Sequence, residues 1–207
     1  MNYYDAFTRT LGQTARTNYD AGFRELAARK IPFARFSAGG FWPQDWGLYQ
    51  TNRSEYFTRL DGVVQSAERH GLGLIPSFFF WKQDTREQFA EMLAADNPSP
   101  MNTLSVRGYD LTNDLGRLAQ AMTVAQAVKK PLFVGEFGVP GATTAESKEE
   151  FAAMVAAIET NRVPISALWV FDNAGQAKDW NVTATNERSW QLDAIQQANE
   201  RMRTRRQ

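Results

Sequence analysis

The chain alternates between short apolar segments and longer amphipathic segments, and this alternation is the feature that most constrains its fold. Apolar runs bounded by turn residues occur at 31–37, 72–80, 103–109, 131–137 and 164–171. Segments with apolar residues at helical spacing lie at 18–30, 54–70, 84–95, 112–129, 143–160 and 187–203. Strands that are apolar throughout and separated by amphipathic helices are typical of a parallel sheet covered by helices. The pattern therefore predicts an α/β protein, either a doubly wound sheet or a (β/α) barrel.

Composition excludes several classes of function. Lys plus Arg number 23 and Asp plus Glu number 23, so the formal net charge is zero and we expect no nucleic-acid or membrane partner. The chain has no cysteine and one histidine, His70, which excludes thiolate and multi-histidine metal sites. No strand is followed by a G-x-G-x-x-G or P-loop sequence, so we expect no cofactor. The 207 residues suffice for one domain, 1–207.

Helix boundaries can be predicted from capping residues. Thr143 and Glu146 make a capping-box pair at the start of the segment 143–160. Asn186 precedes the last helical segment, and we expect it to be the N-cap with Glu187 in the first turn. His70 stands before a glycine and is interpreted as the end of the helix 54–70 rather than as a catalytic group.

Functional groups gather at the ends of the predicted strands. Arg35, Trp81, Tyr109 and Glu136 end four of them, and the last strand ends in Trp169–Asp172. Barrel enzymes carry their chemistry where strands end. A cation, aromatic rings, a phenol and a carboxylate suit sugar cleavage and would suit nucleotide binding poorly. The strand ends therefore favour the barrel over the doubly wound sheet.

These motifs resemble those of glycoside hydrolase family 5, the cellulases and mannanases. "KKPLFVGEFGVPG" resembles the strand-seven motif of that family, which implies that Glu136 is the catalytic nucleophile. "IPFARFSAGGFW" is similar to strand two and "ALWVFDN" to strand eight, which implies that Arg35 lies near the nucleophile and that Trp169 floors a sugar subsite. "TLSVRGYD" looks like strand six, with Tyr109 in place and Arg107 where the family has a histidine. "NYYDAF" looks like the tail of strand one.

One part of the family pattern is absent. Strands four and five, with the Asn-Glu pair that carries the general acid/base, have no counterpart between "SFFFWKQ" and "TLSV". We therefore expect an incomplete (β/α)8 TIM-type barrel of about six parallel strands with helices outside. Possible replacements for the acid/base are acids at predicted strand ends or in the following loops: Asp84, Asp110, Asp172 and Glu187. For each of them a helix cap or a loop acid is the more ordinary interpretation, and a second subunit is another source.

Two further expectations concern partners. Trp42, Trp46 and Trp81 lie in predicted loops, where they are either packed aromatics or stacking platforms for a β-linked oligo- or polysaccharide. A barrel that lacks whole strands leaves unpaired edges at strands three and six, and at strand one. Exposed strand edges invite pairing with another chain, so we expect a homo-oligomer.

Three hypotheses of function follow. The first is a retaining glycoside hydrolase acting on β-1,4-linked glucan or mannan, with Glu136 as nucleophile. The second is a carbohydrate-binding remnant without catalysis, and the third is a truncated barrel scaffold. The sequence "MNYYDAFTRT" lacks the basic start and apolar run of a signal peptide, so the default expectation is a cytoplasmic protein, or a secreted one after loss of a leader.

Overall fold

The computed structural model describes residues 1–12, 16–38, 43–77, 104–108, 111–127, 129–141 and 143–205. In these ranges the strands are β1 (Phe33–Ser37), β2 (Gly73–Ser77), β3 (Leu104–Gly108), β4 (Leu132–Phe137) and β5 (Ile165–Leu168). The helices are α1 (Tyr19–Ala28), α2 (Pro43–Thr51), α3 (Arg53–Arg69), α5 (Leu111–Ala127), α6 (Ala145–Thr160) and α7 (Trp190–Thr204), with 3-10 turns at Thr8–Thr10 and Ala174–Gln176. The predicted helix 84–95 and the end of the predicted strand 72–80 lie outside the described residues.

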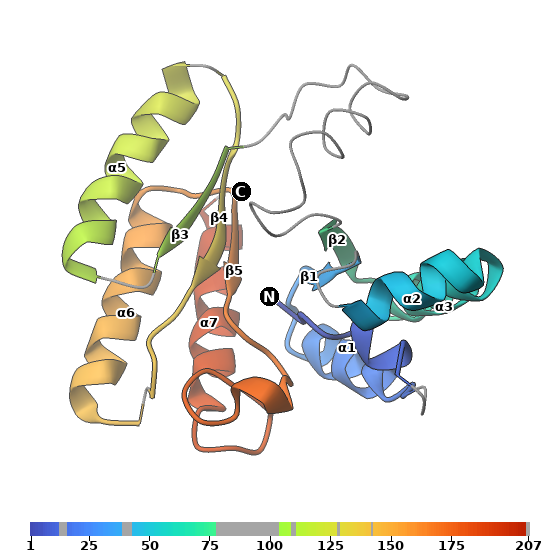
Figure 1. Ribbon diagram of the computed structural model, residues 1–207. Helices are drawn as coiled ribbons and strands as arrows, with labels where there is room; N and C mark the ends of the chain where they lie inside the picture. Colours follow the sequence, from blue (N-terminus) through green and yellow to red (C-terminus); the bar gives the residue numbers. More distant parts are fainter. Residues whose placement is uncertain are drawn as a thin grey trace.

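The described strands form two parallel sheets, β1-β2 and β3-β4-β5, that the N-terminal residues join into one arc (Figure 1). On one side, the Tyr3 N–H donates to the Arg35 carbonyl over 2.8 Å. On the other side, the Asn2 N–H donates to the Leu168 carbonyl and the Phe171 N–H donates to the Asn2 carbonyl, each over 2.9 Å. Residues 1–4 therefore stand between β1 and β5, and the arc runs β2-β1-(1–4)-β5-β4-β3.

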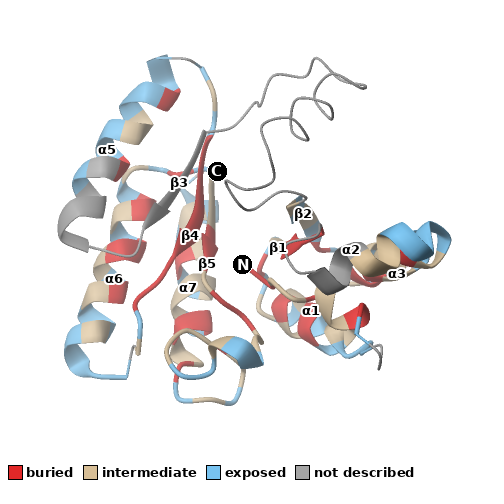
Figure 2. Cartoon of the chain, viewed as in Figure 1, coloured by how far each residue is buried: buried red, intermediate tan, exposed pale blue. Residues whose placement is uncertain are grey.

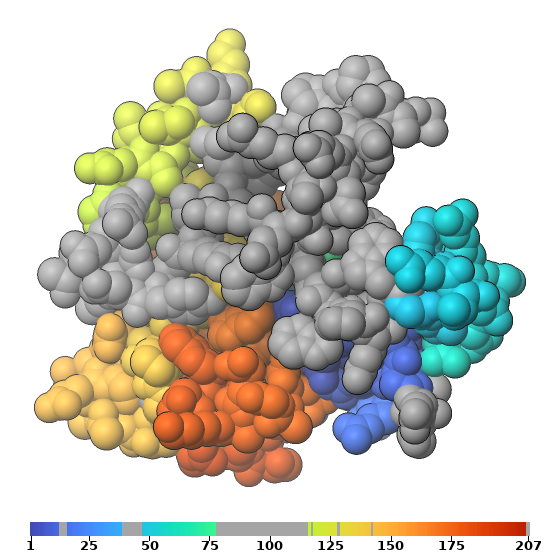
Figure 3. Space-filling view, viewed as in Figure 1, coloured from blue at the N-terminus to red at the C-terminus, as the bar shows by residue number. Residues whose placement is uncertain are grey.

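This arc confirms the expected incomplete barrel and corrects one expectation about its edges. The predicted open edge at the first strand is wrong, because residues 1–4 are hydrogen-bonded on both sides. Within the described residues, β2 and β3 are the two ends of the arc, as expected. In the space-filling view, the N-terminal residues in blue and cyan and the later residues in yellow-green to orange lie on opposite sides of the molecule (Figure 3).

Helices cover the outer face of the arc and bury their apolar sides against it (Figure 2). On one side, the Tyr3 ring meets the Phe23 ring of α1 edge to face, with centroids 5.3 Å apart. On the other, Phe137 of β4 stacks on Phe151 of α6 at 6.0 Å. The buried apolar residues form one cluster that extends from Met1 to Ala198, so both sheets share a core.

Several predicted boundaries differ from the observed ones. The segment predicted as a loop around Trp46 contains the helix α2, which begins at Pro43, a residue suited to a first helical turn because it has no N–H to leave unpaired. The capping box lies one residue later than predicted: Thr144 accepts a hydrogen bond from the Ser147 N–H, and the Ser147 hydroxyl accepts one from the Thr144 N–H.

The start of the last helix also differs. The helix α7 begins at Trp190, so the expected placement of Glu187 in its first turn is wrong. The Asn186 side chain instead accepts hydrogen bonds from the Thr183 and Arg188 N–H groups and closes a turn ahead of the helix. The predicted end of the helix 54–70 is confirmed, with His70 as C-cap and Gly71 at φ +69°.

Two residues after the end of three of the described helices stands a basic residue with left-handed backbone. Lys30, Lys129 and Arg162 follow α1, α5 and α6 with φ of +56°, +53° and +52°, at positions where glycine is the usual residue. In each case the next N–H bonds back to a carbonyl five residues earlier, as Val163 does to Ile158 over 3.1 Å. A Cβ in this conformation costs roughly 1 kcal/mol.

We predict that Arg162→Gly is more stable than Arg162→Ala by about 1 kcal/mol, because only glycine removes the Cβ strain while both lose the same exposed side chain. Urea unfolding followed by circular dichroism measures the difference. Equal midpoints for the two variants would contradict the assignment of strain to this position.

Candidate active site

Glu136 lies at the carboxyl end of β4 and is buried, with 3% of its surface exposed. The pairing of β4 with β3 shifts just before it. Val106 lies opposite Val134, whereas the next residue of β3, Arg107, lies opposite Glu136. Gly135 is therefore the extra residue of a β-bulge, a feature that changes which way the following side chains point.

The bulge reverses the side of the sheet on which the residues after it lie. Phe133 lies on the inner side, with the Arg35 guanidinium 5.9 Å from its ring centroid. Regular alternation would place Phe137 on that same side, but its ring instead stacks on Phe151 of α6 in the helix layer. Glu136 directly precedes Phe137, so the bulge directs its carboxylate to the inner side, toward Arg35.

Arg35 of β1 connects Glu136 to the other sheet. Its Nη1 lies 3.2 Å from Glu136 Oε1 and donates to the Gly135 carbonyl over 3.2 Å. Its Nε donates to Ser77 Oγ of β2 over 2.9 Å. A guanidinium held at three points has little freedom, so it fixes the position of the carboxylate that it contacts.

Asn2 completes this arrangement from the N-terminal strand. Its Nδ2 donates to the Gly135 carbonyl over 2.9 Å and to the Ala167 carbonyl over 3.1 Å, and its Oδ1 accepts from Arg35 Nη1 over 3.3 Å. The bulge displaces the Gly135 carbonyl from the regular ladder, and Asn2 and Arg35 supply the donors that a buried carbonyl requires. Motif reasoning missed Asn2, although it lies in the stretch "NYYDAF" that resembles strand one.

Aromatic side chains lie beside this cluster. Trp169, which follows β5, is half-buried and meets the Tyr4 ring edge to face, with centroids 5.3 Å apart. Gly138 allows the backbone after β4 to lie close to the backbone at Trp169, because a Cβ at position 138 would be 3.0 Å from the Trp169 carbonyl oxygen. Tyr4 was not among the predicted site residues. Its signal was present as the second tyrosine of "NYYDAF", but the sequence does not tell which of the two faces inward.

Asp172 lies on the other side of the strand layer. Its Oδ2 accepts hydrogen bonds from Arg9 over 2.9 Å and from the Tyr3 hydroxyl over 3.1 Å. Tyr3 and Asn2 are successive residues of an extended chain, so their side chains point to opposite faces. Burial raises the pKa of Tyr3 well above its ordinary value, which keeps the phenol protonated as the donor to Asp172. The described contacts therefore separate Asp172 from Glu136.

Glu187 is 57% exposed and pairs with its neighbour Arg188 over 2.8 Å. Arg188 itself is buried and donates to backbone carbonyls of residues 141, 177, 178 and 181. Trp46 lies in α2, and its side chain is outside the described part of the structure. The other predicted site residues also fall outside it: Trp42, Trp81, Asp84, Tyr109 and Asp110.

The described part of the chain contains two buried carboxylates, Glu136 and Glu159. Glu159 of α6 is paired with Arg201 of α7 in the helix layer. Among the same residues, no group of three metal-ligating side chains is present. No described helix is long and apolar enough to cross a membrane.

We predict that Asn2→Ala destabilises the protein by about 1–3 kcal/mol, because it removes the side-chain donor of the Ala167 carbonyl and one of the two side-chain donors of the Gly135 carbonyl, the other being Arg35. Asn161→Ala is the matched control, since Asn161 donates one hydrogen bond, to the Ala157 carbonyl at the end of α6. Chemical denaturation of both variants checks the prediction. A loss for Asn2→Ala no greater than that of the control would show that Asn2 does not hold the arc together.

Neither a family model nor a curated protein sequence matches this chain. Solved structures do match it in three dimensions. A glycoside hydrolase family 5 mannosidase from Rhizomucor miehei aligns with a TM-score of 0.64 and 10% identity over 99% of this chain and 93% of its own. A hyperthermostable endo-1,4-β-D-mannanase from Thermotoga petrophila aligns with a TM-score of 0.64 and 8% identity, over 95% and 98% of the two chains.

A family 5 enzyme from Prevotella bryantii, solved with a xyloglucan tetradecasaccharide, aligns with a TM-score of 0.58 and 13% identity over 96% of this chain and 95% of its own. These matches confirm the predicted resemblance at the level of the fold. The chain therefore has the fold of glycoside hydrolase family 5 structures, in the form of an incomplete (β/α)8 barrel.

Proposed function

We propose that this protein is a retaining glycoside hydrolase that cleaves β-1,4-linked glucan or mannan, with Glu136 as nucleophile. The observation that carries the proposal is a buried carboxylate at the carboxyl end of a barrel strand, aimed inward by a bulge and 3.2 Å from a fixed guanidinium. Strand ends are where barrel enzymes carry out chemistry. The fold neighbours include enzymes named as mannanases and a mannosidase.

In the proposed mechanism, a Glu136 oxygen attacks the anomeric carbon and forms a glycosyl–enzyme ester, while an acid protonates the departing glycosidic oxygen. A water molecule, deprotonated by the same acid/base, then hydrolyses the ester. Arg35 holds the attacking carboxylate in one orientation, which reduces the entropy lost on reaching the reactive geometry. Trp169 and Tyr4 offer ring faces and edges on which the apolar side of a sugar can pack.

The acid/base needs a carboxyl about 5–5.5 Å from Glu136. We propose Asp110 as the first candidate. It comes three residues after Arg107 in the sequence, and Arg107 lies opposite Glu136 in the sheet. Asp84 follows the other end strand, β2, and is the second. Asp172 and Glu187 rank lower, since their carboxylates pair with Arg9 and Arg188.

A second candidate function is glycan binding without hydrolysis, by a catalytically dead remnant of the barrel; the truncated scaffold, which binds no glycan, is the third. The binding function is favoured by the lack of a suitable acid/base among the buried carboxylates of the described residues. Besides Glu136 these include only Glu159, which is paired with Arg201 in the helix layer. Such a protein would use Trp169 and Tyr4 to hold a β-linked sugar while Glu136 has no acid to work with.

We predict that the protein releases reducing ends from soluble β-1,4-glucan or β-mannan and that Glu136→Gln lowers this rate at least about 1000-fold, because the amide cannot form the glycosyl ester. Glu159→Gln is the matched control, since it removes the other buried carboxylate and leaves the site intact. Circular dichroism confirms that both variants are folded.

Equal rates of reducing-end release for the wild-type protein and Glu136→Gln would rule out Glu136 as the nucleophile. In that case, calorimetric titration with mannohexaose and cellohexaose distinguishes the alternatives: saturable binding by both proteins supports the glycan-binding remnant, and no binding supports the scaffold.

We also propose that the protein is a homo-oligomer that pairs through the ends of its arc. The large apolar side chains exposed in the described residues are Phe57 and Val124, at 52% and 53%. They lie on α3 and α5, the helices that precede β2 and follow β3, the two end strands. The stretch 118–127 of α5 contains no charged residue, which is unusual for a helix that faces water.

We predict a mass in solution above the 23.4 kDa of one chain, measured by light scattering during size-exclusion chromatography. Val124→Lys is expected to weaken the association at least tenfold, because it places a charge on the apolar side of α5. Ala152→Lys, on the exposed side of α6, is the control and leaves the mass unchanged. A single monomeric species for the wild-type protein would overturn this proposal.

A further inference from the structure

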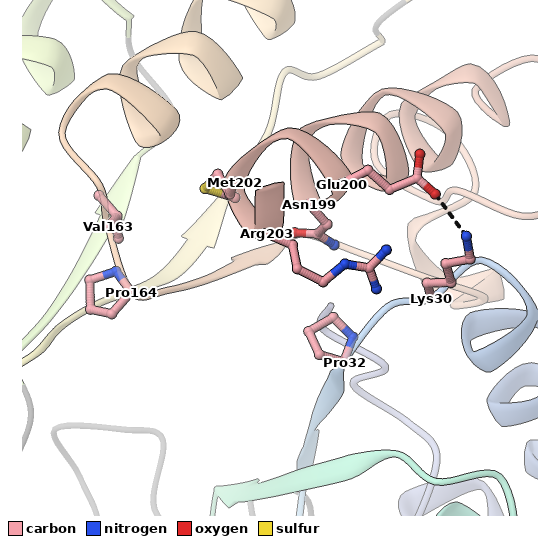
Figure 4. Close-up of a pocket in the computed structure, with 8 residues that line it drawn as sticks. All are labelled: Lys30, Pro32, Val163, Pro164, Asn199, Glu200, Met202 and Arg203. Carbon is pink, nitrogen blue, oxygen red and sulfur yellow. Dashed lines mark hydrogen bonds and ion pairs between the residues drawn. The ribbon is translucent and has the colours of Figure 1, made fainter. Parts of the chain in front are cut away.

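A pocket lies on the opposite end of the strands from Glu136, where α7 faces α1. Two ion pairs connect these helices: Arg29 with Asp193, and Lys30 Nζ with Glu200 Oε1 over 3.0 Å. Pro32 and Pro164, which precede β1 and β5, also line the pocket, Pro32 on the side of Lys30 and Pro164 beside Val163 (Figure 4). The pocket is therefore bounded by both sheets of the arc and is distinct from the candidate active site.

The pocket is large enough for a small organic molecule. It encloses about 270 Å³, close to the lower end of the range of small-molecule sites, which begins near 300 Å³. Its apolar lining comes from Pro32, Val163, Pro164 and Met202. Two smaller cavities share Val163 and Met202 with it, so the apolar surface continues beyond the pocket itself. The prolines and the valine offer rigid apolar contacts to one ring or a short alkyl chain, and the flexible methionine can adapt to either.

Two polar side chains of α7 converge on the same pocket. Asn199 and Arg203 are four residues apart, which places them on one face of the helix, and Figure 4 shows both directed toward Pro32. Among the described residues neither side chain makes a hydrogen bond or a close ion pair, although the charge of Arg203 also acts on Glu200 and helps to lower the pKa of that carboxyl. A guanidinium beside a carboxamide presents several N–H donors, the arrangement that binds a carboxylate.

The charge of the lining indicates the charge of the ligand. Lys30 and Glu200 neutralise each other, and the lysine lowers the pKa of Glu200, so that carboxylate stays ionised at neutral pH. Arg203 then leaves the lining with one net positive charge. A monoanion balances this charge, whereas a cation or a dianion would not.

We propose that this pocket binds a small organic monocarboxylate, with its carboxylate on Arg203 and Asn199 and its apolar part on Pro32, Pro164 and Met202. The site goes beyond the proposed hydrolase function and does not depend on it. Pro32 leads into β1, whereas Pro164 leads into β5 and the other lining residues named here lie on α7. The bound ligand therefore contacts both halves of the arc and stabilises the folded protein by mass action.

The test is an NMR titration of the full chain with benzoate, its neutral isostere benzamide, and acetate, which has the charge without the ring. Benzoate is expected to shift the signals of Asn199 and Arg203 saturably and to raise the melting temperature. Benzamide and acetate are each expected to bind at least about fivefold more weakly, since each lacks one of the two recognition elements.

Arg203→Gln is expected to reduce benzoate affinity at least about fivefold and to leave benzamide unaffected. Arg205→Gln removes a charge from the same exposed helix end. Arg205 lines one of the adjoining smaller cavities but not this pocket, so the benzoate affinity of this variant is expected to stay within about twofold of wild type. Absence of saturable benzoate binding overturns the proposal. So does equal binding of benzamide, or an equal loss in Arg203→Gln and Arg205→Gln, which would indicate attraction by general surface charge.

Discussion

The structure depends on the hydrogen bonding of residues 1–4 between β1 and β5. Within the part of the chain that the structure describes, the two sheets would share no backbone hydrogen bonds without this segment, because β1-β2 and β3-β4-β5 are not paired directly there. The side chain of Asn2 reinforces the join by donating to carbonyls of both β4 and the following strand. A buried segment that bonds on both sides pairs backbone groups that would otherwise be buried without partners, so residues 1–4 are a stable place to join two incomplete sheets.

The candidate active site exists only because the join exists. Glu136 belongs to one sheet and Arg35 to the other, and Asn2 contacts both Arg35 and the carbonyl before Glu136. The bulge at Gly135 contributes the second condition, since it turns Glu136 inward and exposes a carbonyl that Arg35 and Asn2 then bind. The geometry of the carboxylate is thus a property of three strands together, and a rigid site of this kind is what a reaction at a strand end requires.

Local patterns predicted what local physics controls. The apolar runs around Phe33, Val134 and Ala167 form strands, as predicted. β-Branched and aromatic residues between turn residues pack well on the surface of a buried sheet. The same reasoning missed α2, whose short sequence around Trp46 has a mixed pattern, and it placed the capping box one residue early because Thr143 and Thr144 are both suitable caps. It also treated Asp172 as a possible catalytic acid, whereas its contacts are with Arg9 and Tyr3 on the helix side.

The sequence by itself determined the fold class, the order of the described strands and helices apart from α2, and the position of Glu136 and Trp169 at strand ends. These follow from periodicity and from motifs that lie within a few residues of one another. Arg35 was expected at a strand end too, but it lies in the middle of β1. The tertiary structure decided which strands are neighbours, that Asn2 and Tyr4 face inward while Tyr3 and Asp172 face the helices, and that Glu136 meets Arg35. Those outcomes depend on register and on a bulge, and register is set by contacts between residues more than a hundred positions apart, which no local pattern encodes.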